Sequence, residues 1–501
     1  MKTSLLFFLF SFYISIPLIA QQEKRIASAV RVSGKAIEID GNDSDEAWLL
    51  ADWHNQFTQY DPHENTTPSR QTTFKIMYDN HYVYILIKAY EENRNDIISR
   101  NSRRDNLSGD KIGIQFDSYN DKMTAFAFRV SVSGGKADYI ITEDGKNSDW
   151  SWDAIWYAKT SIQDDGWLAE IKIPLSQLRF SLNDNMVWGI QVERFIYRLN
   201  ETSYWQPVSR DNSGWVHNFG ELHGLESLVP KKQIEIQPYS VGKLETSHKN
   251  SENPFSKGKE PFGSVGVDGK IGITNDLTLD FTVNPDFGQV EADPSEVNLS
   301  SFETYFPEQR PFFVEGKNIM SFQLTPGNNG ASSDNLFYSR RIGRSPQIWP
   351  DDSDYEKAPQ NTTILGAAKL TGKTKNGISI GILESLTGQE KTEFVYQGVH
   401  DKITSEPATN YFVSRLQKDF NKGKTRFGAM LTASNRDLGK TEAKFLHKAA
   451  YTGGLDYNLS WKEKTYQVNM KLYGSRVEGS REALLRTQES GVHYFQRPDA
   501  R

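Results

Sequence analysis

Alternating apolar and polar side chains run through the second half of this chain. Between residues 451 and 461 every odd position is apolar or small, and most even positions are polar. After a turn at 462–464 the alternation resumes from Tyr466 to Leu472. Because side chains alternate across a strand, each of these segments has an apolar face and a polar face. Strands of about ten residues, joined alternately by short turns and long loops, are typical of a transmembrane β-barrel.

The alternation predicts nine strands between residues 233 and 475. Their polar face carries charged side chains such as Lys270 and Asp280, which suit a watery lumen, and the other face carries aromatic side chains such as Trp461, which suit a lipid interface. A large soluble sandwich has strands that alternate in the same way, and the pattern alone does not exclude it. The nine strands are expected at 233–244, 263–273, 277–285, 363–372, 378–386, 411–420, 425–434, 451–461 and 465–475.

An odd number of strands does not close a single-chain bacterial barrel, whose strands are even in number. Residues 491–496 are a candidate start of a tenth strand, but the sequence then ends without the terminal aromatic strand that such barrels usually present. The barrel region 233–501 is therefore predicted to be incomplete, as in a truncated gene product or a fragment. If the chain enters the barrel at Gln233 from the periplasm, all the short turns fall on the periplasmic side, which agrees with the barrel rule. These turns are expected at 274–276, 373–377, 421–424 and 462–464.

The first 20 residues have the pattern of a secretory signal. Lys2 gives a positive start, an apolar run extends from Leu5 to Leu18, and Ala20 precedes a plausible cleavage point. The run is too short for a good membrane-spanning helix. Signal and barrel together predict a protein of the cell outer membrane, in contact with its lipid, with the N-terminal domain in the periplasm.

Charge and cysteine content exclude several function classes. The chain has 58 basic and 64 acidic residues, so it lacks the basic balance expected of a nucleic-acid-binding protein. It contains no cysteine, which rules out disulfides, thiolate metal sites and lipid attachment to a cysteine. Membrane anchoring would therefore come from the barrel.

Residues 23–229 predict a β-sandwich that ends near Pro230, because short segments dense in aromatic and β-branched residues follow one another between turns. Several of these segments also resemble the family 9 carbohydrate-binding module and its relatives among DOMON-type sandwiches. They are IDG at 39–41, DEAW at 45–48, YVY at 82–84, GDKI at 109–112, GWLAEIKIP at 166–174 and WGI at 188–190. The resemblance implies a β-sandwich, and more weakly a carbohydrate ligand.

A second resemblance lies in the longer half. The segments NPDFGQVEADPSEVNL at 284–299, FPEQRPFF at 306–313 and FYSRRIGR at 337–344 are similar to a family of uncharacterised Gram-negative outer-membrane proteins, classed as domain of unknown function 5916. In that family a module of the family 9 type precedes a long carboxy-terminal region. The overall expectation is an all-β chain, with a sandwich followed by a transmembrane barrel.

Aromatic residues supply the candidate ligand-binding site. Trp150 and Trp152, two apart on an expected strand, would share a face and offer a platform for a sugar ring. Trp205, with Arg210 nearby, is a second candidate wall. The competing interpretation is a packed core, which is the commoner place for a tryptophan in a sandwich, by roughly two to one.

The insert at 286–362 is rich in acidic and arginine residues. A glycosidase needs two carboxylates at a fixed separation, and the insert region offers Asp286, Glu291, Asp293, Glu296 and Glu303. Carboxylates in a loop more often pair with arginine, and the favoured interpretation is an internal, salt-bridged plug or loop. The arginines available for such pairs are Arg310, Arg340, Arg341 and Arg344.

The residue types predict no cofactor and leave calcium as the one metal alternative. Asn42, Asp43 and Asp45 form an Asp-rich turn of the kind that holds calcium. A helix cap accounts for the same residues without requiring a bound ion, and it is the preferred interpretation. The histidines show no paired spacing, so no catalytic zinc is expected. Some DOMON-type relatives bind haem through Met or His, and the corresponding candidates Met77 and Met123 lie in or beside strand patterns typical of a core.

Three functions remain open. The preferred one is binding of a glycan or another small ligand in carbohydrate catabolism or envelope transport. The second is a glycoside hydrolase that acts on O-glycosyl bonds with carboxylates of the insert. The third is a structural barrel whose sandwich docks a periplasmic partner.

Overall fold

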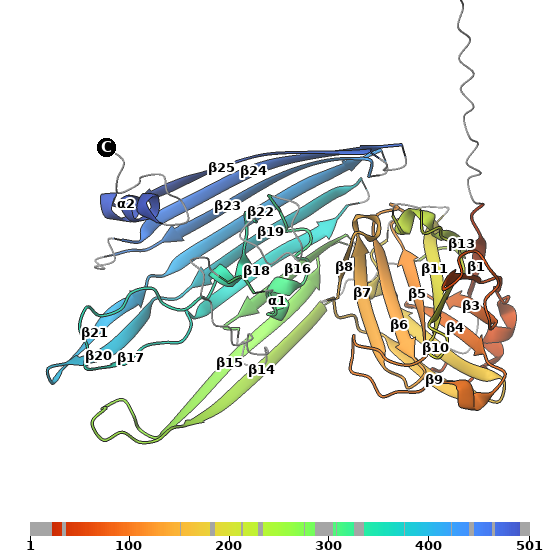
Figure 1. Cartoon of the computed structure of the whole chain (residues 1–501), viewed down its shortest axis with the longest axis horizontal. Coiled ribbons are helices and arrows are strands. Elements are labelled where there is room, and N and C mark those ends of the chain that lie inside the picture. Colours follow the sequence, from red (N-terminus) through yellow and green to blue (C-terminus); the bar gives the residue numbers. More distant parts are fainter. Residues whose placement is uncertain are drawn as a thin grey trace, which may run out of the picture.

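The computed structural model describes most of the chain as strands (Figure 1). This confirms the predicted all-β class. The expected signal segment 1–20 and the expected tenth strand at 491–496 lie outside the described residues. The described residues are 23–32, 37–150, 152–180, 186–211, 214–228, 234–274, 276–285, 304–306, 308–324, 335–374, 376–421, 423–439, 445–462 and 466–490.

The first half folds into two packed layers. The principal order of the 13-stranded sheet is β8-β7-β6-β5-β11-β13-β1-β3-β4-β10-β9, and β12 and β2 extend it from β11. Strand β1 pairs in parallel with both β13 and β3, so it links the two layers. The strands are β1 Ile26–Arg31, β2 Thr58–Asp61, β3 Thr72–Tyr78, β4 Tyr82–Tyr90, β5 Lys111–Asp117, β6 Ala125–Ser131, β7 Lys136–Thr142, β8 Asn147–Asp149, β9 Tyr157–Gln163, β10 Gly166–Pro174, β11 Met186–Ile196, β12 Glu201–Tyr204 and β13 Gly220–Leu225.

The sandwich core lies between these layers. Phe116 and Trp188 from one layer and Ile85 and Trp167 from the other belong to one buried cluster. Alternation on each strand sends every second side chain into this core, so the residues between them are left for the outer surface. Short 3₁₀ helices connect the strands: η1 Glu46–Leu50, η2 Arg94–Asp96, η3 Glu143–Gly145, η4 Leu175–Gln177 and η5 Val216–Asn218.

The second half forms a nine-stranded antiparallel sheet in the order β14-β15-β16-β18-β19-β22-β23-β24-β25. Each of the nine strands predicted from the alternation has its counterpart here. The strands are β14 Ile234–Thr246, β15 Lys259–Gly272, β16 Leu277–Val283, β18 Ile364–Lys373, β19 Ile378–Thr387, β22 Thr409–Phe420, β23 Thr425–Arg436, β24 His447–Trp461 and β25 Tyr466–Gly479.

The long connections also contain regular structure. Residues 387–410, expected only as a long loop, form the hairpin β20 (Glu390–Tyr396) and β21 (Val399–Glu406), which pairs with β17 (Tyr355–Lys357). The other elements are η6 (Ser339–Arg341), α1 (Pro311–Val314) and α2 (Arg481–Glu489). Within the described residues, no helix combines the length and the hydropathy needed to cross a membrane.

The two faces of the nine-stranded sheet differ as the alternation predicted. One face is covered by part of the insert, whose Phe313 and Met320 pack on Leu383 and Val413 of the sheet. The same face carries Lys270, whose ammonium group lies 2.8 Å from the Glu315 carboxylate of the insert. The opposite face leaves large apolar side chains exposed, among them Leu365, Leu386, Leu416, Phe427, Leu431, Leu455 and Trp461.

The described part of the insert is salt-bridged, as the favoured interpretation expected; whether it fills a barrel as a plug stays a prediction. Arg310 of the insert pairs with Glu308 at 2.7 Å, and its guanidinium group donates to the carbonyl oxygens of Ser339 and Ile342. The acidic candidates Asp286, Glu291, Asp293, Glu296 and Glu303 lie outside the described residues.

The sandwich lies at the end of the nine-stranded sheet where the short turns are, away from the β20–β21 hairpin (Figure 1). Ion pairs cross this junction. Arg426 at the start of β23 lies 3.0 Å from the Glu143 carboxylate of the sandwich, and Lys373 at the end of β18 lies 2.7 Å from Asp121. Lys373 also pairs with Asp419 at 2.8 Å, so its single charge joins both halves of the chain.

Candidate functional site

The outer surface of the β7-β6-β5-β11-β12 layer is built from residues that alternate with the core. On β5, Ile112, Ile114 and Phe116 are fully buried in the sandwich core. Their neighbours Gly113 and Gln115 therefore face outward. The same alternation on β6, β7 and β11 produces one continuous outer surface of the layer, part of which is buried beneath Trp215, Val216 and Phe219.

A row of residues crosses this surface in register. Arg129 on β6 is paired with Gly113 on β5, Gly113 with Glu193 on β11, and Glu193 with Tyr204 on β12. A Cβ atom at Gly113 would lie 2.6 Å from the Oε1 atom of Glu193. The glycine thus leaves the space through which the side chains of Arg129 and Glu193 meet above β5.

The Arg129–Glu193 pair is bidentate and largely enclosed. Arg129 Nε donates to Oε1 of Glu193, and its Nη2 donates to Oε2 at 3.0 Å. Burial opposes the charge of Arg129, but Glu193 and Tyr139 outweigh burial, so the pKa of Arg129 lies above its usual value. Arg129 therefore keeps its charge at any physiological pH, and the bidentate pair forms a fixed polar centre.

Aromatic rings surround this centre. On the β7 side, Trp150 stacks on Tyr139 with ring centroids 4.1 Å apart, and the Arg129 guanidinium lies 5.0 Å from the Tyr139 ring. On the β12 side, Tyr204 contacts Trp215 edge to face at 4.8 Å. We call this surface the aromatic face; it comprises Tyr60, Gln115, Arg129, Tyr139, Trp150, Glu193, Tyr204 and Trp215.

Gln115 connects the two sides through hydrogen bonds. Its Oε1 atom accepts from Trp215 Nε1 at 2.7 Å, and its Nε2 donates to Glu193 at 3.4 Å. Burial, and then the nearby Glu193 charge, raise the pKa of Tyr204 well above its usual value, so its hydroxyl stays protonated. The aromatic face therefore combines fixed ring systems with amide, carboxylate, guanidinium and hydroxyl groups, a chemistry that suits a polyhydroxylated ring.

The four residues predicted from the sequence occupy different environments. Trp150 is 43% exposed and belongs to the aromatic face. Trp152 is 8% exposed and packs in the core against Phe126 and Phe128. The expected platform of Trp150 and Trp152 does not form, because β8 ends at Asp149 and the two side chains point to different places.

Trp205 and Arg210 also differ from each other. Trp205 is 3% exposed and packs edge to face on Phe74 in the core. The Arg210 guanidinium pairs with Asp61 and lies 5.2 Å from the ring of Tyr60, on the β12 side of the aromatic face. The structure thus brings Trp150 and Arg210 to opposite sides of one surface and leaves Trp152 and Trp205 in the core.

Sequence reasoning missed Arg129, Tyr139, Glu193 and Trp215. The usable signal was the alternation on β5, β6 and β11, where polar residues stand between buried ones in the middle of a layer. Their assembly depends on the strand order β7-β6-β5-β11, which local patterns do not contain.

The Asp-rich turn at 42–45 differs from the helix cap expected in preference to a calcium site. The Asp45 carboxylate accepts from the backbone N–H of Glu38 at 2.9 Å, and η1 begins after Asp45 without a side-chain cap hydrogen bond, so the cap expected from this turn is absent. Over the described residues, no group of three or more His, Asp or Glu side chains is placed to hold a metal ion.

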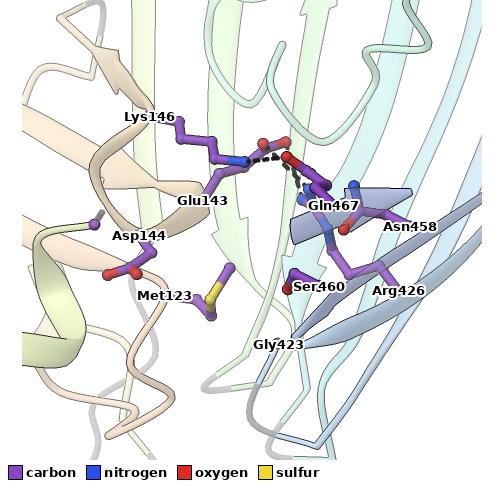
Figure 2. A pocket seen from close by; sticks show the side chains of 10 residues that line it. Met123, Glu143, Asp144, Lys146, Gly423, Arg426, Asn458, Ser460 and Gln467 are labelled. Atoms are coloured by element: carbon purple, nitrogen blue, oxygen red, sulfur yellow. Dashed lines mark hydrogen bonds and ion pairs between the residues drawn. The ribbon is translucent and has the colours of Figure 1, made fainter. Parts of the chain in front are cut away.

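A small polar cavity of about 100 Å³ lies at the junction of the two halves (Figure 2). Glu143 and Lys146 from the sandwich face Arg426 and Gln467 from the nine-stranded sheet, and Lys146 Nζ donates to Gln467 at 3.3 Å. Ordinary ligand pockets measure about 300–1,000 Å³. The cavity is therefore better explained as part of the contact between the halves than as a glycan site.

Comparison with known families gives two matches. Residues 230–497 match the family described as domain of unknown function (DUF5916). Residues 39–202 match the carbohydrate family 9 binding domain-like family. No curated protein matches the chain.

Solved structures similar to part of the chain include carbohydrate-binding proteins. A family 9 module from Caldicellulosiruptor kristjanssonii is similar in its complex with cellotriose (TM-score 0.30, 20% identity, 40% of this chain and 98% of that chain) and with glucose (TM-score 0.30, 20% identity, 40% and 96%). A putative carbohydrate-binding protein from Bacteroides uniformis ATCC 8492 has a TM-score of 0.33 and 11% identity, over 40% of this chain and 100% of that chain.

Proposed function

Because this chain belongs to the DUF5916 family and its first half matches the carbohydrate family 9 binding-like domain, we propose that it is an outer-membrane protein whose sandwich binds glycan. In this proposal the glycan lies on the aromatic face, and the nine-stranded sheet forms part of a barrel wall. The two halves together serve carbohydrate catabolism or envelope transport.

The observation that supports glycan binding most directly is the composition of the aromatic face. Trp150 presents a ring to solvent and is held by the stacked Tyr139 beneath it. The enclosed Arg129–Glu193 pair lies beside this ring, with the guanidinium group 5.8 Å from the ring centroid, and gives it a fixed polar neighbour. Few precisely placed polar groups next to aromatic surface are typical of small-ligand sites.

Calorimetry tests this proposal. The full chain, in detergent, is titrated with cellotriose, with glucose and with a panel of other oligosaccharides. We expect saturable binding of at least one of them. Absence of heat with every glycan would remove the carbohydrate ligand from the proposal, and release of reducing sugar during incubation would favour the hydrolase alternative instead.

The nine-stranded sheet supports the membrane part of the proposal through its exposed apolar face. Leu431, Leu455 and Trp461 lie on that face, and contiguous exposed apolar surface on a soluble protein is unusual. The opposite face is charged and covered by the insert. This is the distribution that a lipid-facing wall with a polar interior requires.

Thiol labelling tests the orientation. Since the chain has no cysteine, a single cysteine can be introduced at Asn250, in the long connection between β14 and β15, or at Asn42, in the sandwich. We expect a membrane-impermeant reagent to label N250C but not N42C on intact cells, and to label both after lysis. Labelling of N42C alone on intact cells would reverse the proposed orientation.

A further inference from the structure

Two arginines near the long-loop ends of the nine-stranded sheet lack a carboxylate partner in the part of the chain that the structure describes. Arg436 is the last residue of β23, and Arg344 belongs to the insert. Among the described residues, neither guanidinium group forms an ion pair, and the Nε atom of each is buried without a hydrogen-bond partner. Arg436 makes one hydrogen bond, from Nη1 to the carbonyl oxygen of His447 at 3.0 Å.

The charges around Arg344 do not balance it. Arg436 and Arg341 act on it as like charges, and the carboxylate that acts in the opposite sense is Glu406. Glu406 is buried and accepts hydrogen bonds from Gln347, through the backbone N–H at 3.1 Å and through Nε2 at 2.9 Å. Glu406 is therefore held by Gln347 rather than by a guanidinium group.

The fold nevertheless holds Arg344 in place. Its carbonyl oxygen accepts from the backbone N–H of Thr362 at 2.9 Å and from the Thr362 hydroxyl at 2.6 Å. On the other side, the Tyr411 hydroxyl reaches the carbonyl oxygen of Arg341 at 3.5 Å, close to Arg344. The backbone of Arg344 is thus fixed within the insert by Thr362, and the insert is tied to β22 of the sheet through Tyr411.

Such an arrangement is unfavourable unless something neutralises it. Bringing like charges together in a partly buried place, and leaving buried N–H donors unpaired, both cost free energy. Guanidinium groups are planar forks that bind carboxylate and phosphate oxygens in pairs. An anion bound between the two groups would satisfy their donors and remove the repulsion.

We propose that Arg344 and Arg436 form a binding site for an oxyanion, the carboxylate or phosphate group of a small solute. The site lies at the end of the sheet opposite to the sandwich, since β23 runs from the short turn near Arg426 to Arg436. The oxyanion site is separate from the aromatic face. The proposal of this site does not depend on whether the sandwich binds glycan.

The test uses the full chain in detergent, titrated with inorganic phosphate and, separately, with glucuronate. Chloride keeps the ionic strength constant. The variants are R344Q and R436Q, and the control is R103Q, since Arg103 is an exposed arginine of the sandwich. Binding is followed by calorimetry and by the rise in unfolding temperature.

We expect the parent and R103Q to bind at least one of the two anions, and R344Q and R436Q to bind it about tenfold more weakly or worse. Binding of glucuronate alone would identify an acidic sugar as the source of the oxyanion, and binding of phosphate alone a phosphorylated compound. Without added anion, R344Q should unfold at the same temperature as the parent or higher, because it removes a like charge.

Three results would overturn the proposal. They are failure of the parent to bind either anion, equal affinity of R344Q and the parent, and a lower unfolding temperature of R344Q in the absence of anion. The last would mean that Arg344 already has a stabilising partner within the protein.

Discussion

Replacing Trp150 with alanine is expected to weaken glycan binding by about 1–3 kcal/mol, roughly 5- to 150-fold, if a sugar stacks on this ring as nucleic-acid bases stack on aromatic side chains. The domain should remain folded, because Trp150 is 43% exposed and leaves no cavity in the core. Calorimetry on W150A with the best glycan of the panel measures the change.

Trp53 provides the matched control. It is also exposed, at 39%, but it lies beside Lys75 on the other layer of the sandwich. W53A should bind with parental affinity. If W150A and W53A both bind like the parent, Trp150 is not part of the site, and if both weaken binding equally, the loss is not specific to the aromatic face.

The core tryptophans give the opposite result. Trp152 and Trp205 are packed against core rings, so W152A and W205A should each lose about 3–5 kcal/mol of folding stability. Any loss of binding in these variants would follow from unfolding rather than from a missing ligand contact. Tryptophan fluorescence distinguishes unfolding of the sandwich from loss of a ligand contact. It reports mainly on the sandwich, because all of the 11 tryptophans except Trp349 and Trp461 lie there.

Substitution of Glu170 is expected to have the second large effect, on stability. The Glu170 side chain is fully buried on β10, and its two carboxylate oxygens accept from the backbone N–H groups of Asp40 and Gly41, at 3.0 and 2.8 Å, and from Trp48 Nε1 at 3.1 Å. In E170Q an amide nitrogen faces at least one of these donors. The unsatisfied donor should cost about 1–3 kcal/mol.

The cost should depend on pH. Burial raises the pKa of Glu170 to about 7, although its hydrogen-bond donors act in the opposite direction. The folded protein therefore binds the proton more tightly than the unfolded chain, in which the pKa of Glu170 is the ordinary value of about 4.5. The contribution of protonated Glu170 to the free energy of unfolding is fully present below about pH 4.5. It decreases by on the order of 3 kcal/mol as the pH rises toward and through 7.

Urea unfolding of the parent and E170Q between pH 4.5 and 8, followed by tryptophan fluorescence, measures this dependence. E170Q lacks the titrating group, so its disadvantage should be largest at low pH and should shrink as the pH rises. A constant difference across this range would show that Glu170 does not titrate there. E226Q, which changes a surface glutamate, serves as the control.

The nine strands of the second half could be predicted because their signal is local. Alternation within each segment, such as 451–461, determines which face is apolar, and a short turn determines which strand is its neighbour. The hairpin at 387–410 was missed because polar residues dominate β21, whose sequence begins Val399-His400-Asp401-Lys402.

The aromatic face could not be predicted in the same way. Arg129 and Glu193 are 64 residues apart in the sequence, and they meet because a glycine at 113 lies between them in the strand order. Trp150 and Trp152 were assigned to one strand face because their spacing suits a strand. The chain leaves β8 at Asp149, so this spacing no longer determines where the side chains point.

The junction between the two halves limits which sandwich domains could replace this one beside the nine-stranded sheet. Glu143 and Arg426 are 283 residues apart in the sequence, and Asp121 and Lys373 are 252 apart, yet each pair must match in charge. A sandwich grafted from a relative would leave Arg426 without Glu143, and Lys373 with Asp419 alone, unless it had acids at the equivalent places. The two modules should therefore diversify as a matched set, with compensating changes on both sides of the junction, rather than as interchangeable parts.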